Sequence, residues 1–76
     1  MALRQNILEK LNQPRVRAKI VLASPKEITD STVKRWIRNN DDALTKLWLL
    51  NLIKVELEVE ENQIFEPVAY KSISNN

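Results

Sequence analysis

Apolar residues recur at helical spacing in the first stretch of the chain. Leu3, Ile7, Leu8 and Leu11 fall on one face of a helix, and the positions between them carry good helix formers. The pattern predicts a first helix within residues 2–12.

A second apolar stripe follows a short polar interruption. Its members are Val16, Ile20 and Ala23, with Val21 and Leu22 widening it. Pro14 suits the first position of a helix, and Pro25 disfavours a helical conformation at the residue before it. We therefore expect a second helix over residues 14–23, buried on one side.

Residues 29–39 divide into two helical faces of different chemistry. One face is apolar and holds Val33, Trp36 and Ile37. The opposite face holds Ser31, Lys34, Arg35 and Arg38, at the spacing i, i+3, i+4 and i+7. Thr29 or Ser31 can cap the start, where Asp30 also favours a helix N-terminus. The pattern is typical of a helix packed on one side, and a solvated basic face is the simplest alternative.

Two structures are compatible with the connection between these helices. Ser24 and Glu27 have the spacing of a capping box around Pro25, so a continuous helix could begin there. The run of Thr, Asp, Ser and Thr over residues 29–32 instead favours caps and turns. We favour a turn in which Ile28 points inward, with the helix starting near Asp30.

The segment from Leu44 to Leu57 is apolar on nearly every side. A helix of this kind must bury both faces. One face could pack on the core of the domain and the other on a second subunit, or the N-terminal helix and the tail could cover the extra surface.

Residues 55–60 alternate between apolar residues and glutamate. This alternation could form a strand paired with residues 63–68, which would give a winged helix. From Pro67 onward we expect an extended or frayed tail, which Tyr70 and Ile73 could tether.

The composition excludes most catalytic chemistry. The chain of 76 residues has no Cys, His or Gly, so a thiol nucleophile, an imidazole base, a Cys/His zinc site and a glycine phosphate loop are all absent. The glutamates of residues 56–61 resemble a solvated charge run. We expect no enzyme, no cofactor, no metal and no small-molecule substrate.

The hydropathy of the chain argues against a membrane-spanning segment and a signal peptide. No apolar run approaches the ~20 residues needed to span a bilayer. Arg4, Glu9 and Lys10 interrupt any apolar core of a signal peptide. We therefore expect a cytoplasmic protein with no membrane partner.

Charge is distributed unevenly along the chain. Residues 1–38 contain nine Lys or Arg and three Asp or Glu, whereas residues 39–76 contain three and seven. The two parts therefore carry net charges of +6 and −4. The basic part could bind a polyanion, or the two parts could simply attract each other.

Three features in chain order match one known family. They are a helix ending near Ala23, a turn with an inward Ile28, and the segment TVKRWIRNNDDALT. Together they resemble the helix-turn-helix of small phage-repressor and Cro-like DNA-binding proteins. Downstream, Leu50, Leu57, Val59 and Ile64 have the spacing of that family's fourth helix, exit turn and fifth helix.

The resemblance implies an all-α fold and a regulator of transcription. It implies a compact bundle of four to five helices containing a helix-turn-helix, with residues 1–66 as one domain and residues 67–76 as a tail. The expected partner is double-stranded DNA, with a homodimer through Leu44 to Leu57 as a further possibility on a two-fold symmetric operator.

The resemblance also assigns roles to particular residues. The helix over residues 30–39 would enter the major groove. Its groove-facing set would be Thr29, Ser31, Lys34 and Arg35, with Arg38 nearer a phosphate. Arg35 is the preferred sequence reader because arginine bonds bidentately to guanine. Arg15, Arg17 and Lys19 would add backbone contacts from the second helix.

Two departures from the family are visible. The family usually has glycine in the turn between its second and third helices, and commonly after its fourth, where this chain has residues 25–27 and Glu58. The competing functional hypothesis is a protein-interaction module that uses the apolar fourth helix and binds no DNA. Convergence of the basic side chains on one surface free of carboxylates would favour DNA binding.

Overall fold

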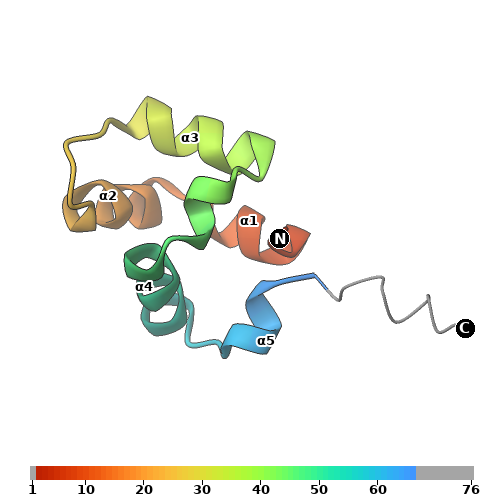
Figure 1. Ribbon diagram of the computed structural model, residues 1–76. Coiled ribbons are helices and arrows are strands. Elements are labelled where there is room, and N and C mark those ends of the chain that lie inside the picture. The colour runs from red at the N-terminus through yellow and green to blue at the C-terminus, as the bar shows by residue number, and fades with distance from the viewer. Residues whose placement is uncertain (1, 67–76) are drawn as a thin grey trace, which may run out of the picture.

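The computed structural model describes residues 2–66, which form a bundle of helices (Figure 1). The elements are α1 (Gln5–Leu11), α2 (Pro14–Ala23), α3 (Asp30–Asn39), the 3₁₀ helix η1 (Asp42–Thr45), α4 (Leu47–Leu57) and α5 (Glu61–Ile64). The predicted all-α fold is confirmed. The predicted tail, with Tyr70 and Ile73, lies outside the described residues.

The connection between α2 and α3 is a turn rather than a helix. The Ser24 hydroxyl bonds to the backbone of Lys26, accepting from its N–H at 3.2 Å and donating to its carbonyl at 2.6 Å. The start of α3 is capped by Thr29, whose Oγ1 accepts from the backbone N–H of Thr32 at 3.3 Å. Ile28 is half-buried against the core. The predicted turn is confirmed, and the continuous helix from Pro25 is wrong.

The alternating segment over residues 55–60 forms the end of α4 and the turn before α5 instead of a strand. Helix α4 ends at Leu57, and Glu58 takes the left-handed conformation with φ 55°. Helix α5 begins with a capping box between Glu60 and Gln63. Through residue 66 the described chain contains only one isolated β-bridge, between Leu3 and Phe65. The winged-helix alternative is therefore wrong, because α4 takes residues 55–57 of the alternating segment and α5 takes residues 61–64, which include the start of the expected partner strand.

The core draws on every helix of the described chain. Its buried apolar side chains are Leu3, Ile7, Leu8, Leu11, Val16, Ile20, Val33, Ile37, Leu44, Leu49, Ile53 and Ile64. The predicted stripe of α2 is only partly correct, because Leu22 is 85% exposed and Ala23 is also exposed. At the end of α2 the chain turns away toward α3, while Arg17 occupies a buried position earlier in the same helix.

Helix α3 lies along one side of the bundle. Figure 1 shows α3 at the top of the molecule, with α2 beneath it and α4 lower still. Helix α2 contacts α1, α3 and α4, so it is the central element of the packing. As a result α3 has one face on the bundle and the opposite face in solvent.

Two distant segments hold the N-terminal residues in place. The Asn40 side chain accepts from the Leu3 N–H through Oδ1 at 3.0 Å, and it donates to the Leu3 carbonyl through Nδ2 at 3.1 Å. On the C-terminal side, the Arg4 N–H donates to the Ile64 carbonyl and the Glu66 N–H to the Ala2 carbonyl. Asn40 itself is left-handed, with φ 49°, a conformation that asparagine tolerates better than most residues.

Replacement of Asn40 should therefore be costly. We expect Asn40→Ala to lower the free energy of unfolding by about 2 to 4 kcal/mol, because both polar groups of buried Leu3 lose their partners and alanine disfavours positive φ. Asn40→Gly should cost less, since glycine tolerates the left-handed conformation. Urea unfolding of both variants measures this, and an alanine variant as stable as the parent would contradict it.

Candidate nucleic-acid interface

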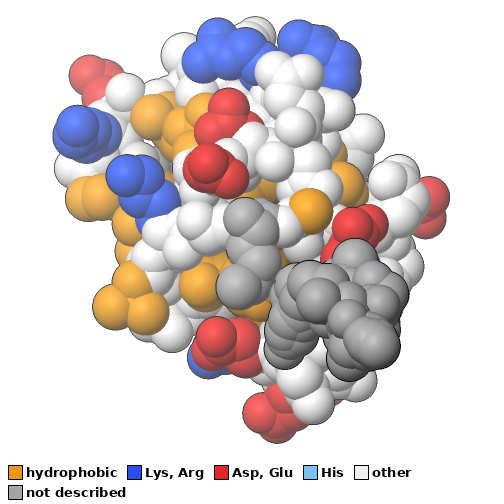
Figure 2. Space-filling model, turned by 45° about the vertical axis from the view of Figure 1, so that its right-hand side comes forward, with side chains coloured by type: hydrophobic (Ala, Val, Ile, Leu, Met, Phe, Trp, Pro, Cys, Tyr) orange, Lys and Arg blue, Asp and Glu red, His pale blue; other side chains and the backbone are white. Residues whose placement is uncertain are grey.

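The exposed face of α3 carries the polar set that its periodicity predicts. Ser31, Lys34, Arg35 and Arg38 are all exposed, whereas Val33 and Ile37 on the opposite face are buried. Figure 2 shows basic side chains gathered at the top of the molecule, where Figure 1 places α3. The helix thus combines a buried apolar face with a basic face in solvent.

Three cations on this face differ in how far they are neutralised. Within residues 2–66, the guanidinium groups of Arg35 and Arg38 make no ion pair or hydrogen bond. Lys34 Nζ lies 3.9 Å from Asp30 Oδ2, one turn earlier in the helix. Both of these side chains are about half exposed, so solvent screens the pair and it contributes little. The two arginines are the cations most available to an external anion.

Arg17 has a different environment from the α3 cations. It is only 9% exposed, and its Nε donates to Asp30 Oδ1 at 2.9 Å. Its Nη1 donates to the carbonyl and to Oδ1 of Asn12, at 2.7 and 2.9 Å. Arg17 thereby joins the end of α1, the first turn of α2 and the start of α3. These contacts satisfy a buried cation within the fold.

The other two basic residues of α2 point toward α4. Lys19 Nζ donates to both carboxylate oxygens of Glu56 at 2.9 Å, and Arg15 lies 4.0 Å from the same carboxylate. The predicted basic residues therefore separate into three groups: the α3 face, the buried Arg17, and the Arg15 and Lys19 pair beside Glu56. The basic residues therefore do not share one surface, and within the α3 group Lys34 lies near Asp30 while Arg35 and Arg38 have no ion pair among residues 2–66.

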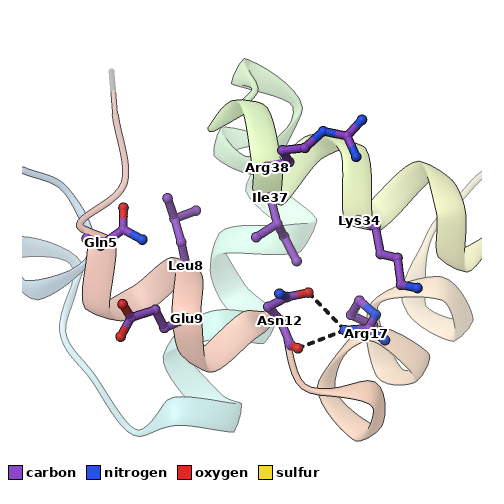
Figure 3. Close-up of a pocket in the computed structure, with 8 residues that line it drawn as sticks. All are labelled: Gln5, Leu8, Glu9, Asn12, Arg17, Lys34, Ile37 and Arg38. Atoms are coloured by element: carbon purple, nitrogen blue, oxygen red, sulfur yellow. Dashed lines mark hydrogen bonds between the residues drawn. The ribbon is translucent and has the colours of Figure 1, made fainter.

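A polar hollow of about 570 Å³ opens beside α3 on the side of α1 (Figure 3). Its lining residues are Gln5, Leu8, Glu9, Asn12, Arg17, Lys34, Ile37 and Arg38. In Figure 3, Lys34 extends from α3 toward the part of the hollow that holds Arg17, while Arg38 points away from α1. Ile37 and Leu8 form its apolar floor.

Analysis of the sequence did not identify the α1 residues of this hollow. Gln5 and Glu9 lie on the polar side of α1, which the apolar spacing of that helix does indicate. The spacing says nothing about which neighbouring helix these side chains face. Glu9 adds a carboxylate to the lining of this hollow, on the α1 side, across from Lys34 and Arg38 on α3 (Figure 3).

Between positions 2 and 66 the chain contains neither a metal-binding cluster nor a membrane-spanning helix. No group of three or more His, Cys, Asp or Glu residues between positions 2 and 66 is arranged to hold a metal ion. Within the same residues, none of the helices has the length and apolar character needed to cross a bilayer.

Thr29, another predicted site residue, uses its side-chain oxygen as the cap of α3.

The geometry of Arg17 predicts a structural effect on substitution. We expect Arg17→Met to lower the free energy of unfolding by about 1 to 3 kcal/mol, because Asn12 and Asp30 lose their donor while half-exposed Asp30 recovers some hydration. Arg15→Met, at an 83% exposed side chain, should change it by less than about 0.5 kcal/mol. Chemical denaturation distinguishes the two, and equal effects would contradict the prediction.

Comparisons with protein-family models, curated proteins and solved structures found no match to the chain. Its function therefore has to be inferred from its own residues. The exposed basic face of α3 is the feature from which that inference starts.

Proposed function

We propose that the chain binds double-stranded DNA by placing α3 in the major groove. The single observation that carries this proposal is the exposed pair of Arg35 and Arg38 on a helix whose other face is buried. The order of α2, a turn and α3 supports it, because a helix presented in this way can enter a groove that is wide enough for it.

Each α3 side chain has a proposed task in such a complex. Arg35 contacts base edges, since its guanidinium is free to bond bidentately to guanine. Arg38 and Lys34 neutralise phosphates. Ser31, exposed in the first turn, is a further polar contact near the bases. We propose a role in transcription regulation because sequence-specific binding by so small a domain fits a regulator.

The contributions of the remaining basic residues should be smaller. Arg17 acts by holding α3 in position, because its Nε and Nη1 donate to Asp30 and Asn12 within the fold. Arg15 and Lys19 share the carboxylate of Glu56, so a phosphate would have to compete with that carboxylate. These two residues therefore provide an internal comparison for the arginines of α3.

The DNA proposal predicts unequal effects of two double variants. Arg35→Ala/Arg38→Ala should weaken binding to a pooled random duplex and reduce the slope of log Kd against log salt by about two. Arg15→Ala/Lys19→Ala removes the same charge and should change the slope by less than about one. Fluorescence anisotropy of labelled duplex measures both, and circular dichroism confirms folding. Equal losses would show that only total charge matters and would contradict a role for α3.

A variant at Glu9 should bind duplex DNA more tightly than the parent chain in the same anisotropy experiment. Glu9→Gln removes a carboxylate from the hollow that Lys34 and Arg38 also line, so repulsion of a phosphate on this side of α3 should fall and DNA affinity should rise by about two- to fivefold at low salt. Glu58→Gln changes the net charge equally at the end of α4 and should have a smaller effect. An unchanged affinity for Glu9→Gln would place the DNA backbone away from the α1 side of α3.

We also propose that a second copy of the chain covers the exposed side of α4. Leu47 and Val55 are 74% and 78% exposed and lie two turns apart on one stripe, with Asn51 between them. Packing of two such stripes would bury this apolar surface and produce a dimer with two α3 helices.

The dimer proposal predicts a concentration-dependent mass. Val55→Lys should raise the dissociation constant of the dimer by more than about tenfold, because it introduces a charge into the apolar contact. Sedimentation equilibrium measures this, with Lys10→Glu as a variant altered outside the stripe. A parent chain that stays monomeric at all accessible concentrations would exclude this dimer.

A further inference from the structure

A second hollow lies beside α3, on the side of the α2–α3 turn and the start of α4. Its volume is about 330 Å³, at the lower end of the ~300 to 1,000 Å³ typical of ligand sites. Its floor is formed by Ile28, Trp36 and Trp48, all half-buried and packed against the core. We call this the tryptophan hollow. Its size suits one or two apolar side chains.

The walls of the tryptophan hollow come from three parts of the chain. Trp36 belongs to α3, Trp48 to α4, and Ile28 to the turn before α3. The turn is held in shape by the two hydrogen bonds between Ser24 and the Lys26 backbone. The hollow is therefore present in the folded chain and does not require a partner to form it.

The rim of the tryptophan hollow is basic. Lys26 and Lys46 line it, and no Asp or Glu is among its lining residues. Neither ammonium group makes an ion pair with any residue between positions 2 and 66. Leu47, 74% exposed, directly follows Lys46 in the chain. An apolar floor with an unpaired basic rim complements an acidic, apolar ligand.

We propose that the tryptophan hollow binds a short acidic segment of a partner protein, with one apolar side chain between the tryptophans and flanking carboxylates on Lys26 and Lys46. This proposal is independent of DNA binding, because it uses neither Arg35 nor Arg38. It gives the chain a second binding surface on the other side of α3 from Glu9 and Arg17.

Charge argues against two of the occupants that the chain itself could supply. A two-fold contact of the hollow with itself would bring the lysines of two copies together, and like charges repel. Residues 67–76 include Lys71 and no Asp or Glu, so their side chains offer no carboxylate to Lys26 or Lys46. An external acidic segment satisfies both the floor and the rim.

The two tryptophans make the proposal directly measurable. They are the only tryptophans in the chain, and both line the hollow, so intrinsic tryptophan fluorescence reports on this site. The probe is a synthetic peptide without tryptophan, containing two leucines flanked on each side by three glutamates. One control peptide replaces its glutamates with lysines, and another replaces its leucines with serines.

We expect the acidic leucine peptide to shift the emission to shorter wavelength in a saturable way, and the two control peptides to have no effect. Lys26→Glu/Lys46→Glu should bind the acidic peptide at least tenfold more weakly and should gain binding of the lysine peptide. Lys10→Glu, in α1, should bind the acidic peptide as the parent does. Because the Lys26→Glu/Lys46→Glu variant should prefer the lysine peptide to the acidic one, the test requires no change to the tryptophans or the core.

Several results would overturn the proposal. They are no shift with the acidic peptide, equal shifts with all three peptides, or unchanged binding in the Lys26→Glu/Lys46→Glu variant. Loss of DNA binding in that variant, with peptide binding unaffected, would assign the rim lysines to DNA.

Discussion

The position of α3 depends on one buried cation. Arg17 bonds to Asn12 at the end of α1 and to Asp30 at the start of α3, while its own helix, α2, contacts both neighbours. A buried guanidinium is stable only when its donors are satisfied, so these three elements are held at fixed relative positions. Arg17 occupies one carboxylate oxygen of Asp30, and the other oxygen lies 3.9 Å from Lys34 Nζ on the basic face of α3.

The two sides of α3 have opposite chemistry. Toward α1 the neighbouring hollow is polar and includes Glu9, whereas toward α4 it is apolar and includes Trp36 and Trp48. The exposed ridge between them carries Arg35 and Arg38. One helix thus presents a basic ridge suited to a polyanion and an apolar edge suited to a protein segment, which allows two partners on one small domain.

Much of the fold could be predicted from local pattern, and less of the site. The bounds of α2 and the start of α3 follow from Pro14 and from the cap at Thr29, because these signals act within a few residues. The burial of Arg17 could not be predicted, since periodicity does not show which helix faces a charged residue. For the same reason the sequence could not show that Lys19 pairs with Glu56, whereas the cations of α3 face solvent.

The proposed contact of DNA with the exposed face of α3 can be located by an NMR titration. A ¹⁵N-labelled chain titrated with duplex DNA should show its largest shifts at the α3 backbone amides and at the Nε groups of Arg35 and Arg38. The amides of α5 should move little, because α5 lies far from α3 in Figure 1. Shifts concentrated in α4, or no shifts at low salt, would contradict DNA binding through α3.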